Sequence, residues 1–272
     1  MTTRLTRAGR VVVGVLVLAL VAGVLATAGI LAVRWAWGES DCAVQRGDAT
    51  VELDAGEAEA AARVVAQSVA QSSARSGAAA GTGVGRKAPR ERLVERVAHL
   101  LDDSPSEGDR KDAVVVVDAL TGRLQGALSC QHVGPFRSAS DRLGPDGLVP
   151  RAEAVRRDME AAFGDLDLGG FAPGGVRSGH MKGSAHYEGR AIDVFFRPID
   201  PRHQRQGWAL AQYLVANAER LRIATVIFDD QIWTARRGAQ GWREYRVDTR
   251  GEDRRTAAIL EHRDHVHVDV AD

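Results

Sequence analysis

The sequence has no excess of charge of either sign, and this lack excludes one large class of partners. Its 272 residues contain 36 Lys and Arg against 36 Asp and Glu, so the formal net charge is zero. Proteins that bind nucleic acid normally present a basic face. The chain is also poor in aromatic residues, at 5%, and no cluster of Lys and Arg has aromatic residues interleaved with it. We therefore expect no nucleic-acid partner.

Long hydrophobic runs are missing except at residues 11–33, which carry no charge. About 20 apolar residues span a bilayer. Arg4, Arg7 and Arg10 precede the run, and this positive flank places the N-terminus in the cytoplasm. We expect a single-pass anchor in the cell membrane, with the C-terminal part extracytoplasmic. The alternative is a signal peptide cleaved near residues 26–28, which would make the protein secreted.

Cysteine is scarce, with Cys42 and Cys130 alone. Neither forms a known nucleophile pattern with a histidine, which argues against a thiol protease. Both follow the apolar run and would lie outside the membrane, where disulfides persist. A Cys42–Cys130 disulfide and two free buried thiols are the two alternatives, and the sequence does not decide between them.

The chain divides into three predicted parts. Residues 1–37 form the cytoplasmic stub and the anchor. Residues 38–145 form an extracytoplasmic accessory region, in which residues 72–90 are a flexible linker rich in Gly, Ala and Ser. Apolar spacing predicts helices over residues 57–71 and 91–101. Residues 102–112 are expected to be a polar loop, and residues 113–117 and 124–128 a β-hairpin that turns at Thr121-Gly122.

Residues 146–272 are expected to form the principal domain. The patterns predict helices over residues 150–163 and 205–221, a strand over 191–196, a hairpin of 225–228 with 231–234, and a last strand over 265–270. Side chains alternate along a strand, so His265, His267 and Asp269 would share one face. The predicted fold class is α+β, a small antiparallel sheet with flanking helices, preceded by one transmembrane helix.

One motif carries most of the chemistry in the sequence. It is Ser184-x-His186-x-x-Gly189-x-Ala191-x-Asp193, followed far downstream by His265-x-His267. Two imidazoles and one carboxylate suit a catalytic zinc ion whose fourth position stays open to water. Gly189 permits a turn that brings both ends of the first segment to one ion. The two late histidines would reach the same cleft.

A second, incomplete copy of the motif begins six residues earlier, at Ser178. Its histidine is His180, but its carboxylate position falls on Tyr187. We therefore expect His180 to line the cleft and contact substrate rather than bind the metal. Arg190 is a further candidate for binding a substrate carboxylate, as are Arg177 and Arg263.

The complete motif resembles that of the LAS metallopeptidases, which include zinc D-alanyl-D-alanine peptidases, murein endopeptidases and the hedgehog signalling domain. The six residues between His186 and Asp193 match the D-Ala-D-Ala peptidase and hedgehog branch, and the flanking sequence is similar to a group of secreted actinobacterial proteins. The resemblance covers residues 146–272 and implies a hedgehog or DD-peptidase-like fold. It implies His186, Asp193 and His267 as the zinc ligands.

The resemblance also assigns catalytic groups, with one departure. D-Ala-D-Ala carboxypeptidases carry Glu three residues before the last ligand, where this chain has the shorter Asp264. The murein endopeptidase pattern His-x-x-His-x-His is matched by His262, His265 and His267. The resemblance thus implies that His265 accepts the proton of water or stabilises the oxyanion. His262 would orient the water or donate to the leaving amine, and Asp264 is a secondary candidate for the base.

These patterns lead to two hypotheses of different classes. The first is an exported zinc peptidase or amidase that hydrolyses amide bonds in peptidoglycan stem peptides. The second is a catalytically silent, zinc-stabilised binding module of the cell envelope, because the hedgehog domain keeps its metal while serving in binding. The departure at Asp264 is the feature that leaves the second hypothesis open.

Overall fold

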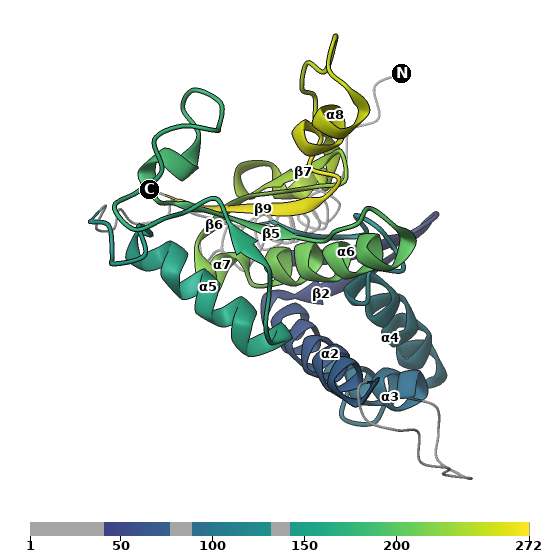
Figure 1. The fold of residues 1–272 in the computed structure, drawn as a ribbon. Coiled ribbons are helices and arrows are strands. Elements are labelled where there is room, and N and C mark those ends of the chain that lie inside the picture. The colour runs from purple at the N-terminus through teal and green to yellow at the C-terminus, as the bar shows by residue number, and fades with distance from the viewer. Residues whose placement is uncertain (1–40, 77–88, 132–141, 272) are drawn as a thin grey trace, which may run out of the picture. The chain divides into compact units, whose positions relative to one another are not determined.

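The computed structural model describes residues 41–76, 89–131 and 142–271 (Figure 1). The predicted membrane anchor at residues 1–37 lies outside these ranges, as does most of the predicted linker. Among the described residues, no helix is long and apolar enough to cross a membrane. Residues 40–272 form one compact unit with one hydrophobic core, so the predicted division after residue 145 falls inside that unit.

Two antiparallel sheets organise the unit. The smaller sheet has the order β2-β1-β3, with strands β1 (Asp41–Arg46), β2 (Ala49–Asp54) and β3 (Leu128–Cys130). The larger sheet has the order β4-β5-β9-β6-β7-β8. Its strands are β4 (Leu168–Gly169), β5 (Ala191–Phe195), β6 (Ile223–Phe228), β7 (Gln231–Thr234), β8 (Arg243–Glu244) and β9 (His265–Val270). Together with the helices, these sheets confirm the predicted α+β class.

Helices flank the larger sheet on both sides. They are α2 (Ala55–Ser76), α3 (Pro89–Leu101), α4 (Glu107–Leu120), α5 (Pro150–Phe163), α6 (Pro201–Ala216), α7 (Ala218–Leu221) and α8 (Arg254–Leu260), with short 3-10 helices η1 (Ala185–Glu188) and η2 (Ala235–Gln240). Figure 1 shows α5 and α6 along one face of the sheet, with α2, α3 and α4 beyond them. The segments that carry η1 and α8 lie on the other face.

Helix α6 is the central element of the core. Asp200 caps its N-terminus by accepting from two backbone N–H groups, and every residue from position 207 to 216 is buried. Gln212 is fully buried within it: its amide oxygen accepts from Ala127 N and Leu128 N, and its amide nitrogen donates to Ala119 O and Leu124 O. This single side chain ties the segment between α4 and β3 to the principal domain.

The predicted loop over residues 102–112 and the predicted hairpin at residues 113–128 are wrong. Ser106 and Asp109 form a capping box, which starts α4 at Glu107. The β-branched residues that follow continue that helix because its apolar face packs into the core, and packing overrides their weak strand preference. The strand downstream begins only at Leu128 and pairs with β1.

Most other predicted elements are confirmed with small shifts of their ends. The hairpin of residues 225–228 and 231–234 is present as β6 and β7. The helix predicted over 205–221 begins earlier, at Pro201, and is interrupted at Asn217, whose side chain donates to Tyr213 O. Cys42 and Cys130 face each other across β1 and β3 and form a disulfide, which settles the alternative that the sequence left open.

Candidate metal centre

The centre begins with two residues on adjacent central strands. Asp193 on β5 and His267 on β9 are directly paired in register, so their side chains leave the sheet together. Both are buried, at 6% and 8% exposure. Asp193 Oδ1 lies 3.1 Å from His267 Nδ1. The expectation that His265, His267 and Asp269 share a strand face is met by β9, because all three side chains line the same pocket.

A third donor comes from η1, just before β5. Ser184 caps this short helix, and Gly189 ends it in the left-handed conformation with φ 68°. Gly189 is required there because an added Cβ would lie 2.5 Å from Gly147 O. The turn places His186 Nε2 3.0 Å from His267 Nδ1 and 3.2 Å from Asp193 Oδ1. Three donor atoms from two distant segments thus lie within 3.2 Å of one another.

The other nitrogen of each imidazole is already engaged. His186 Nδ1 lies 2.7 Å from Gly170 O, so Nδ1–H donates to this carbonyl and Nε2 keeps its lone pair. His267 Nε2 lies 3.4 Å from Asp269 Oδ2, which leaves its Nδ1 toward the other donors. Partners of this kind fix the tautomer and orientation of metal-binding histidines.

Gly170 makes close packing around these donors possible. A Cβ at this position would lie 2.3 Å from His186 Cε1, 2.5 Å from His186 Nδ1 and 2.9 Å from Asp193 Oδ2. Its φ of +79° is also a conformation that favours glycine. Any larger residue would displace both side chains.

The electrostatics of the cluster favour a positive charge at its centre. Burial opposes ionisation of Asp193, but hydrogen bonds from His186 and His267 outweigh burial and hold its pKa well below the usual range. Burial also opposes the charge on His267, yet the hydrogen bonds to Asp193 and Asp269 raise its pKa to about 9. Two carboxylates around one imidazole create a site where a cation is stabilised.

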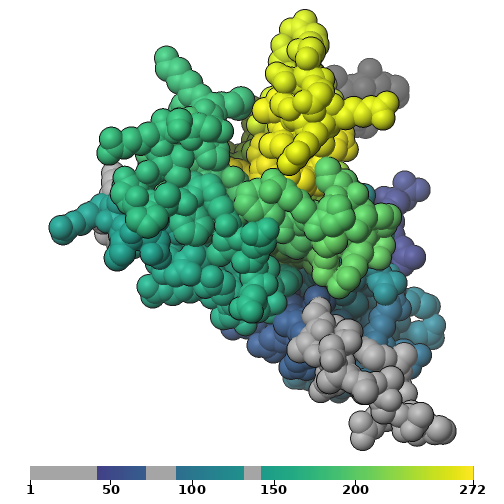
Figure 2. Space-filling model, viewed as in Figure 1, coloured from purple at the N-terminus to yellow at the C-terminus, as the bar shows by residue number. Residues whose placement is uncertain are grey.

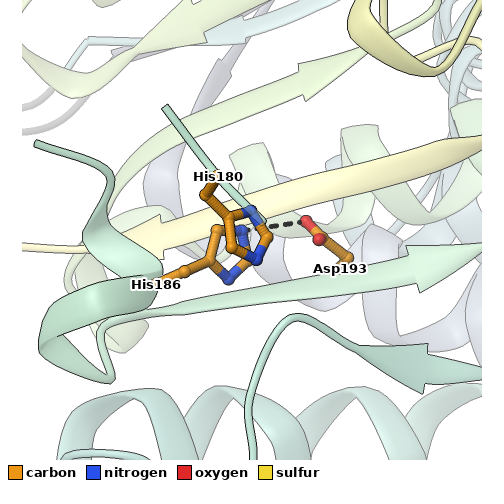
Figure 3. A group of neighbouring side chains, drawn as sticks. All are labelled: His180, His186 and Asp193. Carbon is orange, nitrogen blue, oxygen red and sulfur yellow. Dashed lines mark ion pairs between the residues drawn. The ribbon is translucent and has the colours of Figure 1, made fainter. Parts of the chain in front are cut away.

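His180 joins the same group. One ligand atom each from His180, His186 and Asp193 lie within 4.8 Å of one another, an arrangement that could bind a metal ion (Figure 3). The rings of His180 and His186 are stacked, with centroids 3.9 Å apart. Tyr187 holds His180 in place, because its hydroxyl accepts from His180 N and donates to His180 O. Tyr187, which occupies the carboxylate position of the incomplete motif, therefore positions His180.

Next to these donors stands an oriented histidine. His265 Nδ1 lies 2.7 Å from Asp264 Oδ1, and His265 Nε2 lies 3.9 Å from Asp193 Oδ1. The other carboxylate oxygen of Asp264 accepts from Arg197 Nε at 2.7 Å. Burial opposes ionisation of Asp264, but its bonds to His265 and Arg197 lower its pKa. Asp264 is thus a buried carboxylate with both oxygens occupied.

His262 completes the set of histidines. Its Nδ1 lies 3.0 Å from Leu260 O, and its ring lies 4.5 Å from that of His265 between centroids. Burial, together with the nearby His265 and His267, lowers the pKa of His262 to about 3. The neutral ring donates from Nδ1–H to Leu260 O, which leaves Nε2 unprotonated and able to accept a hydrogen bond.

One open pocket of about 630 Å³ is lined by Asp193 and by five histidines, which are His180, His186, His262, His265 and His267. The pocket lies between the segment of residues 179–186 and the C-terminal segment of residues 245–269. Figure 2 shows the surface hollowed between these green and yellow segments. Arg190 also lines the pocket, but its guanidinium bonds to Glu188 and to Val270 O. Arg177 and Arg263 do not line it, and Arg263 pairs instead with Glu261, Asp229 and Asp230.

Sequence reasoning missed Gly170 and Arg197. Gly170 lies in a glycine-rich stretch that reads as an ordinary loop, and no pattern marks it as the residue that accommodates His186. Arg197 lies 67 residues from Asp264, and no spacing rule connects them. Both act through contacts that only the fold creates.

Comparison with protein families gives a match to part of the chain. Residues 144–257 match the family model described as VldE, C-terminal domain. The match covers less than half of the chain, includes His180, His186 and Asp193, and ends before His262. No curated protein and no solved structure matches the chain. The resemblance to LAS metallopeptidases stays a prediction from the motif.

Proposed function

We propose that this protein is a zinc-dependent hydrolase of peptide or amide bonds that acts on peptidoglycan stem peptides. The observation that carries the proposal is the triangle of His186 Nε2, Asp193 Oδ1 and His267 Nδ1, with sides of 3.0 to 3.2 Å. Donors at about 2.0–2.2 Å from a tetrahedral zinc ion lie roughly 3.3–3.6 Å apart. The three side chains would accept zinc with movements of a few tenths of an ångström.

We assign His186, Asp193 and His267 as the ligands. His180 lies within 4.8 Å of His186 and Asp193, but it stacks on a ligand instead of completing the tight triangle. Catalytic zinc sites keep one position open, whereas structural sites are closed by four protein ligands. Three ligands beside an open pocket therefore support a catalytic role, and we assign His180 to contact with substrate.

The chain's own groups supply the proton transfers. When bound, zinc acts as a Lewis acid on the scissile carbonyl and lowers the pKa of coordinated water to about 7. His265 turns Nε2 toward the centre because Asp264 holds its Nδ1–H. Nε2 is therefore placed to take a proton from water and return it to the leaving amine. Neutral His262 serves as an acceptor that orients the water.

Asp264 acts as a positioning residue in this proposal. Its two oxygens accept from His265 and from Arg197, so neither is directed at the metal centre. The shorter carboxylate that departs from the D-Ala-D-Ala peptidase pattern thus has a different task, which is to fix the tautomer and rotation of His265. The arrangement corresponds to the endopeptidase-like His-x-x-His-x-His pattern.

The predicted location of the protein supports the proposal, because the proposed substrate lies outside the cytoplasm. The charge-free run at residues 11–33 predicts export, with an anchor in the membrane or a cleaved signal as the alternatives. The disulfide between Cys42 and Cys130 fits an oxidising compartment outside the cytoplasm. Peptidoglycan is the amide-rich polymer found there in bacteria.

The test is hydrolysis by the full chain. We expect the zinc-loaded protein to release new amines from purified peptidoglycan fragments, and a chelator to stop the release. His186→Ala should abolish it, whereas His99→Ala, on the exposed side of α3, should leave it unchanged. Release that persists with both the chelator and His186→Ala would overturn the proposal.

A zinc-stabilised binding module is the second candidate. One observation favours it. Both oxygens of the Asp264 carboxylate are already hydrogen-bonded, so this group is not free to act as a base. This alternative predicts one zinc per chain, strong thermal stabilisation by zinc and no turnover of any wall fragment. The same preparation distinguishes the two, because metal content and amine release are measured separately.

A further inference from the structure

A second pocket adjoins the metal-centre pocket. Its volume is about 560 Å³, and its lining residues include Arg197, Ile199, Arg254, Arg255, Ile259 and Asp264. Arg197 and Ile259 line both pockets, so one elongated ligand can contact the two in turn. Of its lining residues, the chemistry described above uses Asp264 and its partner Arg197, and it gives no role to the others.

Its charges are unbalanced. Asp264 is its carboxylate, and it is already bonded to Arg197 and His265. Arg254 and Arg255 are exposed, and neither makes an ion pair or a side-chain hydrogen bond with any described residue. The exposed Asp253, which caps α8, is close enough to feel the charge of Arg255 but makes no ion pair with it, so both guanidinium groups stay available to a ligand.

The metal-centre pocket also carries unpaired charge that is positive. Of its carboxylates, Asp193 belongs to the metal triangle and Asp269 faces His267. Exposed Lys182 lines it without an ion pair to a described residue. On a chain with a formal net charge of zero, the unpaired charges that line the two pockets are all positive. A ligand that spans them gains by being anionic.

Apolar surface accompanies the charge. Ile199 and Ile259 line the second pocket and are 48% and 39% exposed, among the few large apolar side chains left in solvent. The planar guanidinium group of arginine forms paired hydrogen bonds with a carboxylate, and exposed isoleucines can pack against aliphatic side chains. Peptides with a free carboxylate and short aliphatic side chains provide both.

We propose that the second pocket is a carboxylate-binding subsite, in which Arg254 and Arg255 hold an acidic residue of a peptide whose scissile bond lies at the metal centre. The proposal rests on the hydrolase function for the identity of the bond, but not for the binding itself. It gives the enzyme a preference for anionic peptides over neutral peptides of the same length.

The test uses two dye-labelled tetrapeptides, Ala-Glu-Lys-Ala and Ala-Gln-Lys-Ala, which differ in one carboxylate. Their binding to the full chain is measured by fluorescence polarisation, with zinc and with a chelator. We expect the glutamate peptide to bind roughly three to ten times more tightly, since exposed ion pairs each contribute modestly. The preference should shrink as salt is raised to about 0.5 M.

The double variant Arg254→Gln/Arg255→Gln should reduce the preference to less than about twofold. Arg236→Gln/Arg237→Gln is the matched control, because it removes another exposed adjacent pair that lines neither pocket. Equal binding of both peptides by the unmodified protein, or a preference that survives the first double variant, would overturn the subsite. A carboxylate preference without any amine release from wall fragments would keep the subsite and reject the hydrolase.

Discussion

Asp193 and His267 stand opposite each other on β5 and β9, and the sheet itself sets the 3.1 Å between Oδ1 and Nδ1. His186 is the only one of the three proposed ligands that arrives from a turn, held by Gly170 O and the η1 cap. The proposed metal centre therefore has two ligands on rigid strands and one that depends on local turn geometry. This difference leads to predictions that distinguish the proposed ligands from the residues that contact them and from the residues that hold them in position.

The first prediction compares His186 with His180. We expect His186→Ala to weaken zinc binding by at least about 100-fold, because it removes one of the three proposed ligands. His180→Ala should weaken it by less than about tenfold, because His180 stacks on His186 outside the tight triangle. Isothermal titration with zinc measures both values. Equal losses in the two variants would show that His180 is a fourth ligand.

The second prediction concerns Gly170. An alanine there would overlap His186 Nδ1 and Asp193 Oδ2, so Gly170→Ala should lower zinc affinity by roughly tenfold or more. Gly174→Ala is the matched control, since Gly174 also has a positive φ, +80°, but an added Cβ meets nothing within 4 Å. Both variants carry backbone strain, so a deficit confined to Gly170→Ala is assigned to the clash. Equal affinities would show that the cluster can relax.

The sequence predicted the part of the site that lies on regular structure. The alternation in residues 265–270 put His265 and His267 on one face of a strand, and β9 has that geometry. The motif also brought His186 and Asp193 together across Gly189, as the structure places them. These residues follow the period of a strand or the conformational demand of a glycine, both of which are local properties.

The rest depended on tertiary contacts. The valine-rich segment after Asp112 looked like a strand, yet the Ser106 and Asp109 capping box and burial against α6 make it helical. Likewise, the sequence predicts that His180 lines the cleft, because Tyr187 occupies its carboxylate position, but it does not reveal that Tyr187 holds His180 beside His186. In both cases the outcome depends on a tertiary contact that cannot be read from the order of residues in the sequence.

The third prediction tests Asp264 as a positioning residue. Asp264→Asn keeps the size of the side chain but weakens its hold on His265 Nδ1–H and on Arg197. We expect kcat for amine release to fall by at least about tenfold, while zinc affinity changes by less than about threefold because no ligand is touched. Glu at this position, in Asp264→Glu, should restore part of the activity. A loss of zinc equal to the loss of kcat would assign Asp264 to the metal centre instead.

The fourth prediction concerns Gln212, which joins the N-terminal part of the described chain to α6. Gln212→Ala removes a side chain that accepts from two backbone N–H groups and donates to two carbonyls. The N–H groups of Ala127 and Leu128 then lose this partner in the buried core, whereas Ala119 O still accepts from Gly122 N. Each unsatisfied buried group costs about 1–3 kcal/mol. We expect the free energy of unfolding to fall by about 3–5 kcal/mol, measured by urea denaturation with the disulfide intact. Gln240→Ala, on the exposed end of η2, is the control and should change it by less than about 0.5 kcal/mol. A small effect at Gln212 would mean that water reaches these backbone groups and that the two segments are joined mainly by apolar packing.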